Sequence, residues 1–268
     1  MLSKFGRHVA VVDMGVHNMD MDGAQLVGRV AAVLRAVSAS MPAGAGTTAV
    51  ADATGLARPT AHRILSSLAA DGFIDRGDQR WYLGPELYLM GAIAAERYDI
   101  TDLARDSLRA LAGETGESAF LSARRGDESV CLLREEGSFP IRSFVLYEGI
   151  RFPLGVASAG LAMLAFLPEE QVERYLATAD LSRWGDEHAP DAVRRRIAET
   201  RTRGYAVNPG LIVEGSWGMG AAVFDRAGQP AWALSLTGVE SRFGPDRRPE
   251  LGRLLLEHAH RISQRLAR

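Results

Sequence analysis

Apolar residues recur every three or four positions in two stretches near the N-terminus, which is the spacing of one face of an α-helix. The stretches are residues 25–38 and residues 58–70. In the second stretch the repeating apolar residues are Ala61, Ile64, Leu65 and Leu68. We therefore expect two amphipathic helices that bury their apolar faces in one small core.

Signals for a shorter helix lie between these two stretches. Thr47 or Thr48 can cap its first turn through the side-chain hydroxyl, and Gly55 can end it because glycine tolerates a left-handed backbone. Pro59 suits the first turn of the helix that follows. The pattern predicts two helices joined by a tight turn.

A short ribbon and a further helix come next. The segments "FID" and "RWYLG" read as two strands with a turn at Gly77-Asp78. After the break at Gly84-Pro85, residues 85–98 show a helical pattern that is apolar on more than one face. Such a helix is usually buried by more than its own domain. A different pattern begins at residue 100, where we place a domain boundary.

The remainder of the chain mixes alternating and helical patterns, which is typical of an α+β domain. The alternating patterns predict strands within residues 118–137, 141–149 and 217–238, the first and last of these as hairpins. The helical patterns cover residues 101–112, 158–167, 168–177, 191–204 and 246–268. Residues 158–167 are apolar almost all round, so we expect a buried helix with Ser158 as its capping residue.

Composition refines this picture only slightly. The 268 residues are 47% hydrophobic and 24% charged, as in an ordinary globular protein. No apolar run reaches the roughly 18 residues of a membrane span, and the single Cys131 excludes an internal disulfide. We expect a cytoplasmic protein without a membrane partner. Residues 1–23 lack a sustained apolar pattern and are expected to be a flexible extension.

The placement of charge on the 58–70 helix is more informative than the net charge of −2. Opposite its apolar face lie Arg58, His62, Arg63 and Ser66, and no acidic residue occurs between positions 53 and 70. A helix fits the DNA major groove, where arginine can pair with guanine and acidic side chains would be repelled by phosphate. Taken alone, this face is also compatible with simple solvation. The order of short helix, turn, helix and ribbon indicates a winged helix-turn-helix.

The succession of motifs resembles the IclR family of transcriptional regulators. The segments "LARPTAHRILSSLAADGFIDR" and "RWYLGPELYLMG" are similar to the DNA-binding half of that family. The segments "EGIRFPLGVASAGLAMLAFLP" and "RGYAVNPGLIVEGSWGMGAAVFDRAGQPAWALSLTG" are similar to its effector-binding half. The resemblance implies a two-domain α+β chain. Its parts would be a winged helix-turn-helix domain (24–84), a linker helix (85–99) and a GAF-like or profilin-like effector-binding domain (100–268).

The resemblance also implies which residues contact ligands. Those expected to contact DNA are Thr48, Arg58, Thr60, His62, Arg63, Ser66, Arg76 and Arg80. Those expected to contact a small effector are Ser158, Ala159, Gly160, Trp217, Gly218, Met219, Ser235 and Thr237. The expected partners are palindromic double-stranded operator DNA, a carboxylic acid as effector, and further copies of the chain in a homodimer or tetramer. No enzyme activity, cofactor or metal is implied.

The sequence departs from the family pattern at two places. Leu161 stands where many relatives carry lysine, and Asn208-Pro209 stand where many carry an acidic residue. The second change removes a side chain that can hold a small polar effector, while Phe144, Trp217 and Met219 add apolar candidates. We therefore predict an effector more apolar than a two- or three-carbon acid, and an aromatic acid is one such class.

Motifs of other protein classes are incomplete. The hydrolase pattern Gly-x-Ser-x-Gly is broken because Val156 stands two residues before Ser158. The segment "AGAGTT" lacks the lysine of a phosphate-binding loop, and the histidines show no metal-ligand spacing. Two further interpretations stay open. One is a constitutive repressor whose second domain serves oligomerisation, and the other is a metabolite-binding or enzymatic protein with a non-functional DNA-binding half.

Overall fold

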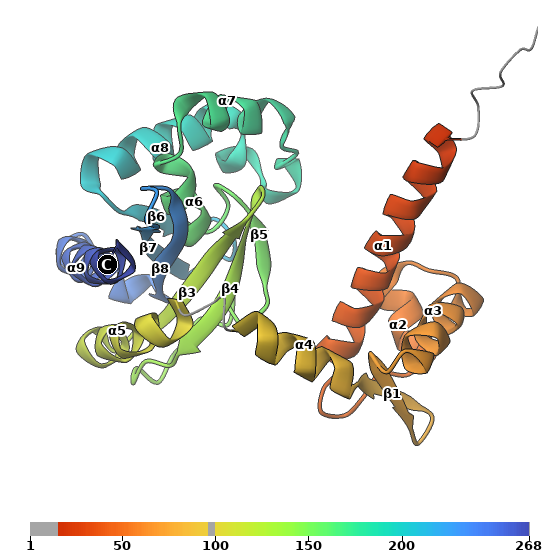
Figure 1. Cartoon of the computed structure of the whole chain (residues 1–268). Helices are drawn as coiled ribbons and strands as arrows, with labels where there is room; N and C mark the ends of the chain where they lie inside the picture. The colour runs from red at the N-terminus through yellow and green to blue at the C-terminus, as the bar shows by residue number, and fades with distance from the viewer. Residues whose placement is uncertain (1–15, 96–99, 268) are drawn as a thin grey trace, which may run out of the picture. The chain divides into compact units, whose positions relative to one another are not determined.

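The computed structural model describes residues 16–95 and 100–267, which divide into two compact units at residues 97 and 98. Figure 1 shows the helices and strands of both units, and each unit has its own hydrophobic core. The first unit is a helical domain with a small ribbon, and the second is an α+β domain built on a six-stranded sheet. None of the helices in these two ranges is long and apolar enough to cross a membrane.

The first unit combines four described helices with a two-stranded ribbon. Its elements are α1 (Val16–Ala39), α2 (Thr47–Thr54), α3 (Arg58–Ala70), β1 (Ile74–Gly77), β2 (Arg80–Leu83) and α4 (Pro85–Ala95). The predicted apolar stripe of α3 is confirmed, because Ala61, Ile64, Leu65 and Leu68 are all buried. Gly55 ends α2 with a φ of 66°, as its position predicts.

Three local predictions for this unit are wrong. The residue before α2 is Gly46, with no side-chain cap; the hydroxyl of Thr47 instead accepts a hydrogen bond from the indole of Trp81. The ribbon turns at Asp78 and Gln79 rather than at Gly77-Asp78, because Gly77 still pairs with Arg80. The third concerns the expected extension over residues 1–23. Helix α1 begins at Val16, so residues 16–23 belong to this helix; residues 1–15 lie outside the described ranges.

The second unit is an antiparallel sheet with helices on both faces. Its strands, in the order β5-β4-β3-β8-β7-β6, are β5 (Arg151–Pro153), β4 (Glu128–Glu135), β3 (Ser118–Arg125), β8 (Pro230–Val239), β7 (Ser216–Phe224) and β6 (Ala206–Pro209). Helices α5 (Ile100–Thr115) and α9 (Arg248–Ala267) pack on one face. Helix α6 (Ser158–Ala165) packs on the other, with α7 (Glu169–Thr178) and α8 (Pro190–Arg203) around it.

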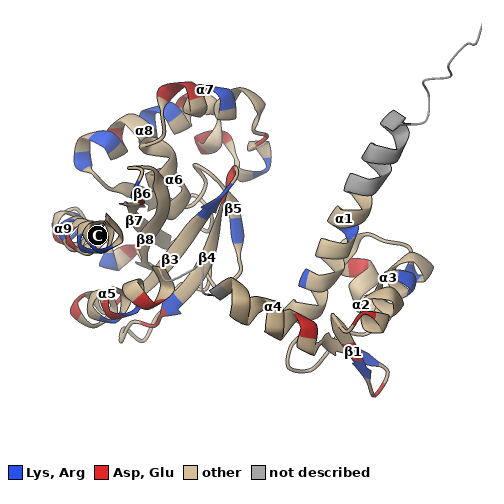
Figure 2. Ribbon diagram, viewed as in Figure 1, with Lys and Arg blue, Asp and Glu red and all other residues tan. Residues whose placement is uncertain are grey.

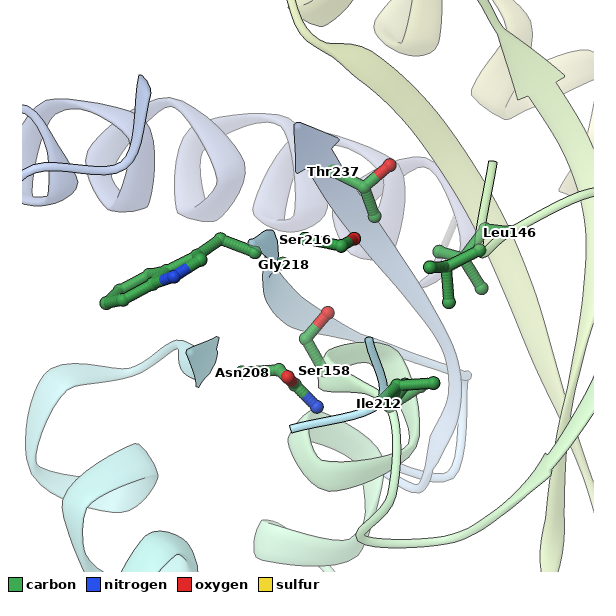
Figure 3. A pocket seen from close by; sticks show the side chains of 10 residues that line it. Leu146, Ser158, Asn208, Ile212, Ser216, Gly218 and Thr237 are labelled. Carbon is green, nitrogen blue, oxygen red and sulfur yellow. The ribbon is translucent and has the colours of Figure 1, made fainter. Parts of the chain in front are cut away.

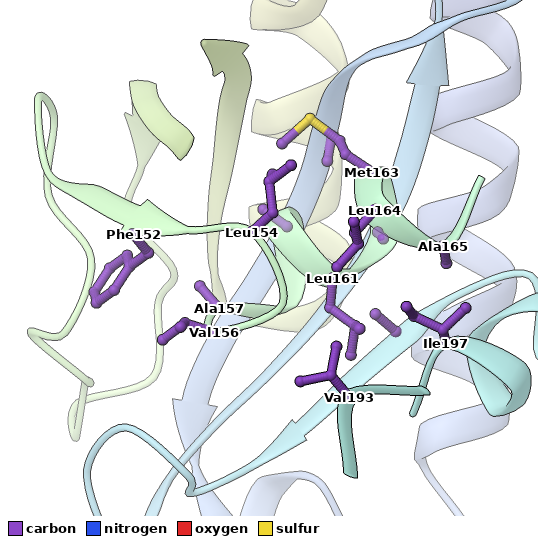
Figure 4. Packing of buried hydrophobic residues seen from close by; sticks show 14 of the residues in the cluster. Phe152, Leu154, Val156, Ala157, Leu161, Met163, Leu164, Ala165, Val193 and Ile197 are labelled. Carbon is purple, nitrogen blue, oxygen red and sulfur yellow. The ribbon is translucent and has the colours of Figure 1, made fainter. Parts of the chain in front are cut away.

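Helix α6 is the centre of the core on its side of the sheet. All eight of its residues are buried, because the sheet and α8 together cover apolar side chains on every side of the helix. Figure 4 shows Leu161 and Leu164 of α6 beside Val193 and Ile197 of α8. The predicted cap is wrong, because Ala157 precedes the helix and Ser158 is its first residue.

The strand predicted for residues 141–149 is also wrong. The outer edge of β4 is occupied instead by β5, which pairs with residues 128–130. The backbone of Cys131 bonds to Ile150 and Gly149, so the outer edge of β4 is paired from residue 128 to residue 131 by residues 149–153, at and beyond the end of the predicted strand. They form an irregular loop in which Phe144 is 79% exposed.

His258 of α9 is buried and lies near Glu114 of α5, with 3.9 Å between Nε2 and the carboxylate. Burial lowers the pKa of His258, and Arg261 lowers it further, against the opposing effects of Glu114 and Glu257. The neutral form is thus favoured in the folded state. Its contribution to stability is complete above the unfolded pKa of about 6.5 and is lost as the pH falls through 6.5 towards the lower folded pKa.

We expect the melting temperature of the wild-type chain to fall more steeply between pH 7.5 and 5.5 than that of His258→Gln, measured by calorimetry. Leu254→Ala, on the same helix, weakens packing without removing a titratable group and should keep the wild-type pH dependence. Parallel curves for the wild type and His258→Gln would contradict this assignment.

Candidate functional site

The exposed side of α3 carries the basic residues predicted from the sequence. Arg58, His62, Arg63 and Ser66 are exposed, opposite the buried stripe, and Thr60 is half-buried. No acidic residue lies on α3, as Figure 2 shows. Thr48, near the start of α2, is exposed as well. The structure therefore gathers the predicted residues of α2 and α3 on accessible positions.

The ribbon adds two arginines to this surface, and both are partly held in place. Arg76 lies with its guanidinium carbon 5.1 Å from the centre of the Trp81 ring. Arg80 donates from Nη1 to the carbonyl of Gly44 at 3.0 Å. Both residues are exposed, so their charge is accessible although their position is fixed.

A second candidate site lies in the α+β unit, where the start of α6 meets β7 and β8. The cavity has a volume of about 20 Å³, which is room for a single water molecule. Its lining residues are Val145, Leu146, Ala157, Ser158, Asn208, Ile212, Ser216, Trp217, Gly218 and Thr237. Figure 3 shows Ser158, Leu146 and Thr237 approaching it from three different elements.

Polar groups at this cavity are only partly satisfied. Asn208 donates to the carbonyl of Val156 and accepts from the N–H of Leu211, at 2.8 and 2.9 Å. The hydroxyl of Thr237, which lines the cavity, and that of Ser235, which lies beside it, are buried and have no hydrogen-bond partner among the described residues. The first N–H groups of α6 also lack partners within their helix. Unpaired buried donors of this kind are costly, and a bound polar ligand would satisfy them.

Glycines bring α6 close to the sheet at this point. A Cβ on Gly220 would lie 2.8 Å from the carbonyl oxygen of Ser158, and one on Gly218 would lie 3.1 Å from its hydroxyl. Any larger side chain would push the helix away. The two glycines therefore determine where the first turn of α6 stands relative to β7.

The structure brings together only part of the predicted effector set. Ser158, Trp217, Gly218 and Thr237 line the cavity. Met219 points to the opposite face and packs in the core with α5 and α9, because successive residues of a strand face opposite sides.

The other predicted effector residues surround the cavity without lining it. Ala159 packs in the α6 core, and Gly160 faces Ser129 and Leu154. Ser235 is fully buried on the α6 face of β8, paired in register with Gly220.

Six lining residues lie outside the predicted set of contacts: Val145, Leu146, Ala157, Asn208, Ile212 and Ser216. Val145 and Leu146 lie in the segment whose alternating pattern wrongly predicts a strand, and Ile212 lies in an irregular segment between β6 and β7. Asn208 was noted only as a departure from the family pattern. The hydroxyl of Ser216 lies 2.5 Å from that of Ser143. These residues are 73 positions apart in the sequence, so no local motif predicts their contact.

The two described ranges indicate neither a metal site nor a reactive cysteine. No three His, Cys, Asp or Glu side chains within them lie close enough together to hold a metal ion. Burial raises the pKa of the Cys131 thiol to about 12, so this cysteine is not a reactive thiolate at neutral pH.

Family models match both units. The model described as the IclR helix-turn-helix domain matches residues 26–78, and the model described as the bacterial transcriptional regulator IclR C-terminal domain matches residues 92–264. The relatives include the HTH-type transcriptional regulator KipR of Bacillus subtilis, 30% identical over 80% of this chain and 86% of KipR. BhcR of Paracoccus denitrificans is 30% identical over 93% of this chain and 90% of BhcR.

Solved structures show the same fold. The IclR regulator of Alicyclobacillus acidocaldarius has a TM-score of 0.74 at 26% identity, covering 89% of this chain and 97% of its own. An IclR homologue from Microbacterium hydrocarbonoxydans, solved in complex with 4-hydroxybenzoate, has a TM-score of 0.71 at 23% identity, covering 90% of this chain and 98% of its own. The relatives are transcriptional regulators and not enzymes. The chain belongs to the IclR family of bacterial transcriptional regulators, with a DNA-binding helix-turn-helix domain followed by an effector domain.

Proposed function

We propose that this regulator binds a palindromic operator through α3 and the β1–β2 ribbon, and that a small organic acid bound beside α6 changes its affinity for DNA. The observation that carries the DNA-binding part is the exposed side of α3, which is basic and free of acidic residues opposite a fully buried stripe. A solvated helix has no need of that asymmetry, whereas a helix in the major groove does.

Within this surface, Arg63 is the candidate for reading a base. It lies in the first half of α3 and is exposed, and the N-terminal part of a recognition helix contacts base edges. Arg58, Thr60 and Ser66 of α3, with Thr48 of α2, would contact bases or the neighbouring phosphates. Arg76 and Arg80 would contact the backbone from the ribbon, whose wing position suits that role.

Replacing Arg63 by alanine should weaken operator binding by about 1–3 kcal/mol and relax sequence preference at one base pair. The measurement is fluorescence anisotropy with the selected operator and with single-base variants of it. Arg109→Ala removes an exposed arginine of the other unit and should leave binding unchanged. An equal loss on operator and random DNA would show that Arg63 contacts phosphate only.

A palindromic operator requires a second copy of the chain, and α4 offers a surface for it. Tyr88, Leu89, Met90 and Ile93 of α4 are between 51% and 78% exposed, an apolar patch of the kind that marks an association surface. We therefore propose that a second copy packs on α4. The two resulting recognition helices would then face two half-sites.

Ile93→Asp should shift the chain towards the monomer, because it places a charge in an apolar contact. Sedimentation velocity checks the oligomeric state, and anisotropy should show a loss of operator affinity of at least tenfold. Val213→Asp makes the same change at a residue 51% exposed in the other unit and should preserve the dimer. A dimer that survives Ile93→Asp would place the association surface elsewhere.

The cavity beside α6 suits an acid with an apolar body. Val145, Leu146 and Ile212 supply apolar walls, and no cationic side chain lines the cavity. A carboxylate would therefore be held by the free N–H groups at the start of α6 and by the unpaired hydroxyl of Thr237. An aromatic hydroxy acid such as the one in the Microbacterium complex has both parts. At about 20 Å³ the cavity must enlarge to admit it.

The double variant Ser235→Ala/Thr237→Val should lower the affinity for aromatic acids at least fivefold, because it removes both unpaired hydroxyls. Binding is measured by calorimetry with benzoate and 4-hydroxybenzoate as probes, and folding by melting temperature. Thr202→Val, which removes an exposed hydroxyl on α8, is the matched control. Unchanged affinity for these two acids would show that the effector binds elsewhere. If only short non-aromatic acids bind, the proposed ligand class is wrong.

Effector control then follows from thermodynamic linkage. An acid changes operator binding only if it binds two arrangements of the protein with different affinity. If an acid raises the melting temperature but does not change operator affinity, its binding to the effector domain does not control DNA binding.

A further inference from the structure

Trp81 of β2 is the point at which the ribbon is joined to the rest of the first unit. Its ring is buried, with only 2% of the residue exposed. Its backbone exchanges two hydrogen bonds of 2.9 Å with Ala45, and its indole Nε1 donates to the hydroxyl of Thr47 at 2.9 Å. Trp81 is thus fixed through both its main chain and its side chain to the start of α2.

The segment before α2 also holds the two residues that flank this tryptophan. Gly44 has a φ of 76° and lies so close to Tyr82 that a Cβ would stand 2.6 Å from the tyrosine ring. Arg80 donates to the carbonyl of the same glycine. Contacts on both sides of Trp81 along β2 therefore hold the ribbon against this segment, and the ring between them keeps one orientation.

Two residues of the proposed DNA-binding surface contact that ring, and they come from different elements. His62 of α3 meets it edge-on, with 6.0 Å between the ring centres and 75° between the planes. Arg76 of β1 places its guanidinium carbon 5.1 Å from the ring centre, within the range of a cation–π contact. Both residues are exposed, so a single buried ring supports two side chains that reach solvent.

His62 has a further restraint. The hydroxyl of Ser66, one helical turn later, lies 3.4 Å from its Nδ1. Nε2 has no hydrogen-bond partner among the described residues. Because Ser66 contacts Nδ1 and Trp81 restrains the plane of the ring, only Nε2 of His62 remains to contact a ligand, and it points in one direction.

We propose that Trp81 is a positioning residue for sequence recognition. It fixes His62, which contacts a base edge through Nε2, relative to Arg76, which contacts the DNA backbone beside it. The inference rests on the proposed function, namely that α3 enters the major groove. Its physical reason is preorganisation: a side chain already held in its binding orientation loses less conformational entropy when it meets DNA.

Double-mutant cycles on the full-length chain test this coupling. The operator is first selected from random duplexes with the wild-type protein, and affinities are then measured by anisotropy. His62→Ala should weaken operator binding about tenfold and flatten the preference at one base pair. Trp81→Leu should flatten the preference at the same base pair. Adding His62→Ala to Trp81→Leu should then cost less than threefold more.

The salt dependence gives a second cycle. Arg76→Ala should reduce the slope of log affinity against log salt concentration by about 0.9 for each phosphate that the protein no longer neutralises. In the Trp81→Leu background the same change should have little effect on the slope, because the guanidinium is no longer held. Trp81→Phe, which keeps an aromatic face and removes the indole N–H, should fall between the wild type and Trp81→Leu.

A stability control separates positioning from folding. Val33→Ala empties part of the same core and should lower the melting temperature while keeping the base preference intact at 20 °C. If Trp81→Leu does not fold, the cycle is run on Trp81→Phe. Additive losses in both cycles would overturn the proposal while leaving the DNA-binding function in place. A wild-type chain with no preference over random duplexes would overturn both.

Discussion

The close approach of α6 to strand β7 is the constraint on which the α+β domain depends. All eight residues of this helix are buried, so its position must satisfy the sheet below it and α8 beside it at the same time. The approach is possible because β7 turns Gly218 and Gly220 towards the helix and Met219 away from it. A strand that alternates glycine with a large residue thus packs one helix tightly on one face and fills a core on the other. The cavity exists where the first turn of α6 comes closest to that strand.

The loop that closes this cavity is anchored by a buried carboxylate. Glu117, with 1% of its side chain exposed, binds Arg242 and Arg247, both through an oxygen at 2.7 Å. Arg242 in turn lies 4.4 Å from the centre of the Phe139 ring, just before the irregular loop. At its other end the loop is held by the backbone bonds between Cys131 and residues 149 and 150. Between these anchors Leu146 covers the cavity, while Phe144 remains in solvent.

Sequence patterns predicted the structure correctly where local residue preferences and tertiary packing favour the same conformation. The α3 stripe and the end of α2 at Gly55 follow from periodicity and from the conformational freedom of glycine. The predictions failed where a distant residue decides the outcome. Thr47 is not a cap because an indole 34 positions away takes its hydroxyl, and residues 141–149 are not a strand because β5 already pairs with β4. The cavity combines residues from β6, β7, β8, α6 and three irregular segments. The family resemblance identified four of its ten lining residues, and periodicity identified none.

The small volume of the cavity has a kinetic consequence. A space of about 20 Å³ is too small for the proposed aromatic acid. Binding of such an acid would require an open form, and the apparent affinity would be reduced by the fraction of time that this form exists. If opening precedes entry, the observed binding rate will level off at high ligand concentration at the rate of opening. The hydroxyl contact between Ser143 and Ser216 joins the loop to β7 at a residue that lines the cavity. If opening separates these two hydroxyls, their contact contributes to the barrier that limits the rate of opening.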